Sequence, residues 1–245
     1  MSVFRARRRG SLLGGFTFGG RIPPVLGFLL AAILAATVVA WILRDASWAV
    51  LEPGLLRRGE VWRLVSWAFV QEHPLTLLFG GLALYSFGLQ LAHDWSERRF
   101  LWTFLGIAAG ASVLTTLVAL VAPVAPHLGM WPVVNALVLM WALRYPEQQL
   151  NFWGVIPLTG RTVVLLLVFG TVLYGLAAGG LVGLLAFTPH FGAMAVGYGL
   201  SRGRFPTRRW RMQWSDFWEE RSFRRRAKHL RVVRKDGQSG KQWLN

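Results

Sequence analysis

Long apolar runs constrain the fold of this sequence more than any other feature. Hydrophobic residues make up 54% of its 245 residues and gather into six segments. A helix that crosses a bilayer needs about 20 apolar residues, with a lower limit of about 17. We therefore predict an all-α polytopic membrane protein. The six segments are Pro24–Leu43, Pro74–Leu91, Phe100–Ala122, Trp131–Leu143, Thr162–Ala186 and Pro189–Leu200.

The distribution of positive charge predicts the topology. The chain has a net charge of +16, and its arginines and lysines gather before Pro24 and after Leu200. Flanks rich in these residues stay cytoplasmic, so two cytoplasmic ends require an even number of spans. We predict six spans, although the fourth and sixth segments are short. We also predict a plasma or inner membrane location, and anionic lipid rather than nucleic acid as the partner of the charge.

Changes in composition divide the chain into three parts. We predict a basic cytoplasmic N-terminus at 1–23, a six-helix membrane domain at 24–203 and a basic, Trp-rich cytoplasmic tail at 204–245. An aromatic stripe beside basic residues is typical of a helix lying in the membrane interface. A plain topology signal is the alternative interpretation of this tail. The predicted lipid-interface residues are Trp210, Trp214, Phe217 and Trp218.

His190 is the candidate functional residue, because it stands at the start of the last apolar segment. An ionisable side chain within a membrane segment suggests a functional site. His73, His127 and His190 would form a metal site only if the fold brought them together. No metal-ligand spacing links them and the chain has no cysteine, so we predict no metal and no cofactor.

Several motifs together resemble the rhomboid superfamily over about residues 24–203. The match includes the Trp62–Arg63 signature of the first loop, the glycine-rich second segment and the sequence His190-Phe-Gly192 of the last segment. The resemblance implies a six-helix rhomboid-like bundle. It also implies an intramembrane serine protease ancestry, with a serine and a histidine facing each other at the outer ends of the fourth and sixth helices.

The departures from the family pattern fall on the catalytic groups. Trp131 stands at the serine position, and Pro132 replaces the glycine that follows it. The family's second-helix histidine and asparagine, which help to hold the oxyanion, fall on Thr76 and Gly80. A chain without nucleophile and oxyanion donors has no acyl-transfer chemistry by this mechanism. We therefore predict a pseudoprotease with no intact catalytic site and a vestigial His190.

Three functions follow from this comparison. The first is a protein that binds transmembrane segments of client proteins without cleaving them, using Trp62, Arg63, Trp131 and His190. The second is an active intramembrane serine protease whose nucleophile is displaced to Thr76 or Thr188. The third is a lipid or small-solute carrier, which the scarcity of charge within the spans disfavours.

Small and polar residues within the segments predict how the helices pack. Glycines at every fourth position let helix backbones approach closely in lipid. Ser112 is expected to be a polar packing residue, and Asn135 is expected to hydrogen-bond a neighbouring helix. The glycines of the two predicted ridges are Gly106 with Gly110, and Gly175 with Gly179 and Gly183.

Overall fold

Prolines mark where half of the described helices begin. The computed structural model describes residues 22–152 and 156–202. The chain divides into two units, Met1–Arg204 and Phe205–Asn245, and the description below concerns the first. Five of its helices carry a proline at the first or second position. Proline suits these positions, because its fixed φ is already helical. The N–H that proline lacks would have no acceptor within the helix at these positions.

The described elements are ten helices and a two-stranded hairpin. In chain order they are α1 (Pro24–Leu43), α2 (Pro53–Arg57), η1 (Val61–Leu64), η2 (Ser66–Ala68), α3 (Pro74–Asp94), α4 (Glu97–Val118), α5 (Trp131–Arg144), β1 (Gln149–Phe152), β2 (Ile156–Thr159), α6 (Gly160–Ala177), α7 (Gly180–Ala186) and α8 (Thr188–Ser201).

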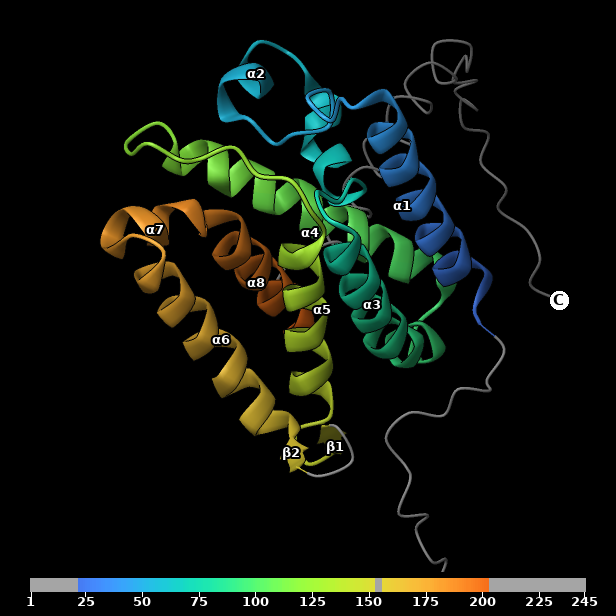
Figure 1. Cartoon of the computed structure of the whole chain (residues 1–245). Coiled ribbons are helices and arrows are strands. Elements are labelled where there is room, and N and C mark those ends of the chain that lie inside the picture. Colours follow the sequence, from blue (N-terminus) through green and yellow to red (C-terminus); the bar gives the residue numbers. More distant parts are fainter. Residues whose placement is uncertain (1–21, 153–155, 203–245) are drawn as a thin grey trace, which may run out of the picture. The chain divides into compact units, whose positions relative to one another are not determined.

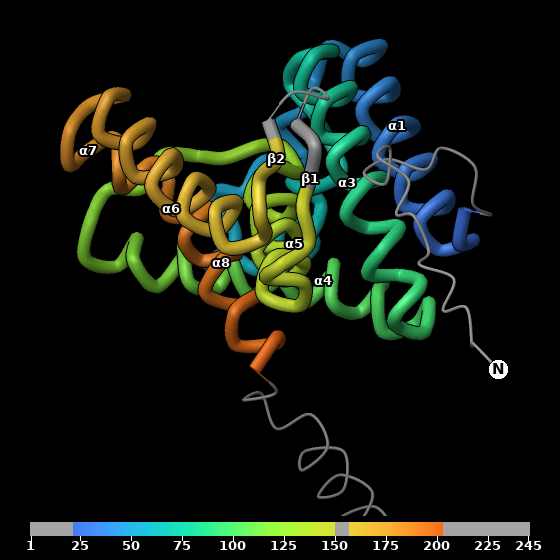
Figure 2. The backbone as a smooth tube through the Cα atoms, turned by 90° about the horizontal axis from the view of Figure 1, so that it is seen from below, coloured from blue at the N-terminus to red at the C-terminus, as the bar shows by residue number. Residues whose placement is uncertain are grey.

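Helix α5 lies at the centre of the bundle. Figures 1 and 2 show α3 and α1 on one side of it and α6 on the other. Helices α4 and α8 pack against each other and against α5. From the hairpin upwards, α6 diverges from α5 as it approaches α7 (Figure 1).

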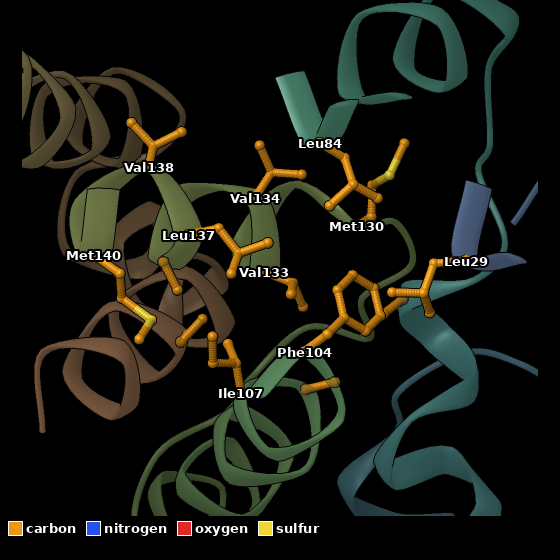
Figure 3. Packing of buried hydrophobic residues seen from close by; sticks show 14 of the residues in the cluster. Leu29, Leu84, Phe104, Ile107, Met130, Val133, Val134, Leu137, Val138 and Met140 are labelled. Carbon is orange, nitrogen blue, oxygen red and sulfur yellow. The ribbon is translucent and has the colours of Figure 1, made fainter. Parts of the chain in front are cut away.

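The core is built on the short helix α5. Figure 3 shows Leu84 of α3 beside Met130, and Phe104 of α4 beside Val133. Trp141 is fully buried, and its indole N–H donates to the Gln90 side-chain oxygen at 2.7 Å. Ten of the 14 residues of α5 are buried, so its apolar sequence reflects contact with protein rather than with lipid.

Helix lengths support the predicted polytopic bundle. Helices α1, α3, α4 and α6 are long and apolar enough to cross a membrane, and the bent pair α7 and α8 forms one further candidate. Helix α5 is apolar but has only 14 residues. The all-α class is confirmed, while the count of six spans stays a prediction because it requires α5 to cross as well.

The predicted single segment Thr162–Ala186 is wrong. The helix breaks after Ala177, and α7 begins at Gly180. Gly180 has a φ of 61°, a left-handed conformation that residues with a Cβ rarely adopt. The glycines therefore end one helix and start the next. Helices α7 and α8 then meet at a 55° bend.

The predicted glycine ridges are only partly present. Gly175 and Gly183 face each other across the break, where a Cβ on Gly183 would collide with the Gly175 carbonyl. Gly110 packs against Val196 of α8, whereas a Cβ on Gly106 would meet open space. Close approach is thus present at Gly110, Gly175 and Gly183. Gly179 lies in the break between α6 and α7, and Gly106 faces open space.

A short hairpin, which the sequence did not predict, joins α5 to α6. Strands β1 and β2 are antiparallel, with Gln149 opposite Thr159 and Phe152 opposite Ile156. Thr159 then caps α6, because its hydroxyl accepts the Thr162 N–H at 3.3 Å. The hairpin therefore sets where α6 starts beside α5.

Candidate functional site

His190 lies in the first turn of α8, directly after the proline that starts the helix. It is buried, with 9% of its surface exposed. Its ring centroid is 4.8 Å from that of Phe187 and 5.2 Å from that of His127. Its Nδ1 is buried and has no hydrogen-bond partner among the described residues. The predicted candidate residue is thus held mainly by aromatic contacts.

His127 joins the first loop to this site. Its backbone exchanges hydrogen bonds with Leu51, with N–O distances of 2.9 and 3.0 Å. Its ring packs edge-on against Trp67 at 5.5 Å and against His190 on its other side. Sequence reasoning named His127 only as one of three histidines for a metal. The long separation of Leu51 from His127 gave no local signal of this pairing.

Burial changes the protonation of His127, which lies in the loop before α5. Desolvation lowers its pKa from 6.5 to about 4, and a hydrogen bond with the Gly129 backbone opposes that shift in part. Burial disfavours the charged imidazolium, which explains the direction. The ring is therefore neutral at pH 7, and its Nε2 is buried without a partner among the described residues.

A cavity of about 600 Å³ opens between α5 and α6 beside the two histidines. We call it the loop-end cavity. Trp131 lines it from the first position of α5 and is partly buried. The remaining lining is mostly apolar. The full lining is Thr76, His127, Leu128, Trp131, Asn135, Leu166, Leu167, Gly170, Thr171, Tyr174, Phe187 and His190.

The hydroxyl groups at the two predicted positions of a displaced nucleophile already donate hydrogen bonds to backbone carbonyls. Thr76 donates to the His73 carbonyl at 2.6 Å, and Thr188 donates to the Leu185 carbonyl at 2.6 Å. Thr171, within the cavity lining, donates to the Leu167 carbonyl at 2.7 Å. Within residues 22–152 and 156–202, no hydroxyl hydrogen-bonds to His190. The serine–histidine contact that activates a nucleophile is therefore missing from the described site.

The two predicted oxyanion positions are used for packing and capping. The Thr76 hydroxyl also accepts the His73 N–H at 3.3 Å, which closes the first turn of α3. Gly80 is buried against Met130, and a Cβ there would lie 2.6 Å from the Met130 methyl group. Neither position offers a side-chain donor to the cavity.

The expected hydrogen bond from Asn135 to a neighbouring helix is not found. The Asn135 amide has no hydrogen-bond partner among the described residues. It lies one turn after Trp131 and lines the loop-end cavity instead. The i to i+4 spacing from Trp131 is the sequence signal that could have placed both on one helix face.

The predicted pair Trp62 and Arg63 lies in the first loop, outside the lining of the cavity. Arg63 is buried, donates to the carbonyls of Ser47 and Val50 at 2.6 and 2.7 Å, and pairs with Glu60 at 2.7 Å. Trp62 is 54% exposed. The guanidinium group thus holds the loop together, and the binding role of the pair stays a prediction.

Ser112 is a polar packing residue, as the sequence predicted. Its hydroxyl accepts the Trp67 indole N–H at 2.8 Å, and the same oxygen lies 2.9 Å from the carbonyls of Leu64 and Ala108. It fixes the first loop against α4. Ser112 is fully buried and does not line the loop-end cavity.

The three histidines considered for a metal do not converge. His127 and His190 are adjacent, whereas His73 is exposed at the N-terminal cap of α3. The part of the chain that the structure describes contains no group of three or more metal-ligand side chains. The predicted interface residues Trp210, Trp214, Phe217 and Trp218, like the basic N-terminus, lie outside the described residues.

The fold and the site together define a polytopic helical membrane protein whose buried His190 has no hydroxyl partner among the described residues. The family model of the Rhomboid domain matches residues 58–206, which is more than half of the chain. The protein therefore belongs to the rhomboid family.

One curated relative is similar over part of the chain. Derlin-1 of Oryza sativa subsp. japonica is 26% identical over 147 residues, which cover 56% of this chain and 57% of Derlin-1. The match thus spans little more than half of the length of that relative.

Proposed function

We propose that this rhomboid family member binds transmembrane segments of client proteins without cleaving them. The observation that carries the proposal is that Trp131 and His190 line one cavity, and that His190 lacks a hydroxyl partner among the described residues. The resemblance to the family places its serine at Trp131. The loop-end cavity then serves as a binding site, with Trp131, Asn135 and His190 in its lining.

The helix beside the cavity supports access from the membrane. Leu166 of α6 lines the cavity and is 53% exposed, and Phe169 on the same helix is 60% exposed. Helix α6 has 18 residues, which corresponds to about 27 Å against a hydrocarbon core of about 30 Å. A peripheral helix shorter than this core favours local thinning of the bilayer, which lowers the cost of holding a polar or short client segment there.

Site-specific photocrosslinking tests this proposal. A photoreactive amino acid is placed at Leu166, inside the cavity lining, or at the neighbouring Leu165, which is 70% exposed and outside it. Fluorescent single-pass peptides with apolar spans of about 16, about 20 and about 24 residues are co-reconstituted with the full chain. We expect adducts from position 166 whose mass equals that of the chain plus an intact peptide.

A matched pair of glycine variants provides the control. Gly170 lines the cavity and Gly106 lies on α4, and a Cβ at either would meet open space. Gly170→Leu should narrow the cavity and lower the adduct about tenfold, whereas Gly106→Leu should leave it unchanged. Equal adducts from positions 165 and 166, or equal effects of the two leucine variants, would contradict the proposal.

An active protease with a displaced nucleophile is the alternative. The engaged hydroxyls of Thr76 and Thr188 disfavour it. The test is a fluorophosphonate probe on the full chain in membranes, compared with His190→Ala. Labelling that His190→Ala abolishes would support the protease, and absence of labelling supports the pseudoprotease.

We further propose that both termini are cytoplasmic and that the 204–245 tail lies on anionic lipid. Each arginine near such a surface contributes about 1 kcal/mol of attraction. Cysteines introduced at Ser2 and Ser239 should react with a membrane-impermeant maleimide only after the membrane is opened.

The isolated 207–235 peptide tests the lipid contact of the tail. Its binding to anionic vesicles should weaken as the salt concentration rises. Binding that does not depend on the salt concentration would contradict the electrostatic part of the proposal.

A further inference from the structure

A second cavity lies at the other end of the bundle from His190. We call it the basic-end pocket. It forms where the α3–α4 connection meets the C-terminal ends of α5 and α8, and its volume is about 390 Å³. This volume lies within the range of small-ligand sites. The lining is Trp95, Arg99, Met140, Leu143, Arg144, Leu200, Ser201 and Arg202.

Two arginines of this pocket have no ionic partner among the described residues. The Arg99 guanidinium lies 4.8 Å from the centre of the Trp95 ring, and that of Arg202 lies 4.6 Å from the Tyr198 ring. Neither forms an ion pair or a side-chain hydrogen bond with a described residue. Ring contacts cover the face of a guanidinium and leave its N–H edges available.

The third arginine is only partly neutralised. Arg144 lies 3.6 Å from an Asp94 oxygen, which also accepts the Tyr145 hydroxyl. Asp94 does not line the pocket. The pocket thus contains three guanidinium groups, of which only that of Arg144 has an ionic partner among the described residues, so the pocket carries net positive charge.

The other wall of the pocket is apolar. Met140, Leu143 and Leu200 line it, and Leu143 is 38% exposed. A free anion would gain nothing from this wall. A molecule with a phosphate at one end and hydrocarbon at the other would satisfy both parts of the pocket.

We propose that the basic-end pocket binds the phosphate group of an anionic phospholipid. Arg99 and Arg202 donate to the phosphate oxygens, Arg144 adds charge, and the leucines contact the start of the acyl chains. Arginine suits phosphate because its planar fork can donate two parallel hydrogen bonds. Basic pockets between membrane helices are suitable sites for such headgroups. This site shares no lining residue with the loop-end cavity.

Photocrosslinking at position 143 tests the proposal on the full chain. A photoreactive residue replaces Leu143, and the protein is reconstituted in phosphatidylcholine with or without phosphatidylglycerol. We expect mass spectrometry to find a phosphatidylglycerol adduct far above its share of the lipid. Inorganic phosphate is added in a separate arm. A lipid ligand should resist this competitor, whereas loss of the adduct would assign the site to free phosphate and overturn the lipid proposal.

Matched charge variants distinguish the pocket from general surface attraction. The Arg99→Gln and Arg202→Gln double variant removes two pocket charges. The Arg98→Gln and Arg161→Gln control removes two exposed charges that do not line the pocket, one of them paired with Glu147 at 2.5 Å. The adduct should be about tenfold lower in the pocket variant than in the control, since hydrogen bonds to charged groups are at stake.

A conservative variant guards against simple misfolding. Arg99→Lys with Arg202→Lys retains the charge and should retain part of the preference for phosphatidylglycerol. Equal adducts in the pocket and control variants, no preference between the two lipids, or a crosslink from position 143 to residues 205–245 instead of lipid would each overturn the proposal.

Discussion

Helices α5 and α6 are adjacent and similarly apolar, yet they meet their surroundings in opposite ways. Ten of the 14 residues of α5 are buried, whereas only three of the 18 residues of α6 are. Trp141 of α5 is fully buried, and Phe169 of α6 is 60% exposed. An apolar sequence therefore does not distinguish a central helix from a peripheral one in a membrane protein, because lipid and protein core accept the same residues.

The loop-end cavity takes one wall from each of these helices. Trp131 and Asn135 belong to the central helix, and Leu166 and Thr171 belong to the peripheral one. Because few residues of α6 are buried, the free energy of its local opening is expected to be low. In the proposed function, clients enter past α6 while α5 keeps the site in place.

The largest expected effect contrasts the two helices directly. Trp141→Ala should lower the free energy of unfolding by about 3 kcal/mol or more, because it leaves a void and deprives Gln90 of its donor. Phe169→Ala should change it by less than about 0.5 kcal/mol. Unfolding by sodium dodecyl sulfate in mixed micelles measures both. Equal effects would contradict the contrast.

The second largest loss of stability is expected at Gly183, where α7 is in close contact with α6. Gly183→Ala should cost about 2 kcal/mol, because its Cβ would collide with the Gly175 carbonyl across the helix break. Gly170→Ala, in open space on α6, should be neutral or slightly stabilising. The same unfolding titration separates the two. A harmless Gly183→Ala would mean that the α6–α7 contact is loose.

A smaller change of stability, with pH, is expected from His127, which lines the loop-end cavity. The pKa of His127 is lowered to about 4 in the folded chain, so the unfolded chain binds the proton more readily. Stability should therefore fall as pH drops from about 6.5 toward 4, by about 1 to 2 kcal/mol between pH 6.5 and pH 5. His127→Phe keeps an aromatic ring and should flatten this slope. Parallel slopes for both proteins would count against the burial of the ring.

The smallest expected effect is none at all. Trp131→Ser restores the residue type at the serine position. It should not give fluorophosphonate labelling, because Gly80 offers no side-chain donor and the Thr76 hydroxyl donates to the His73 carbonyl. Gel fluorescence of the labelled membrane measures this. Labelling of the variant would show that His190 retains its capacity as a base.

The sequence predicted the helices better than the breaks between them. Pro24–Leu43 matches α1 at both ends, and Trp131 starts α5 as expected. These limits follow from local signals, namely a proline and the length of an apolar run. The break after Ala177 was missed, because glycines that break a helix and glycines that pack helices have the same spacing until their φ values are known.

The candidate site was predicted in part for a similar reason. Trp131 and His190 line one cavity. His127 and Asn135 were assigned other roles, since their positions depend on a backbone pairing with Leu51 and on which face of α5 turns toward α6. No local pattern encodes such long-range contacts.

The sequence by itself determined a polytopic helical protein of the rhomboid type, because hydropathy and residue identity are local properties. Tertiary structure alone decided that α5 is central and α6 peripheral, and that Arg63 is buried in its loop. It also decided that Arg99, Arg144 and Arg202 share one pocket. The physical reason is that lipid and protein interior accommodate apolar side chains equally well, so only the packing of the helices determines the neighbours of each residue.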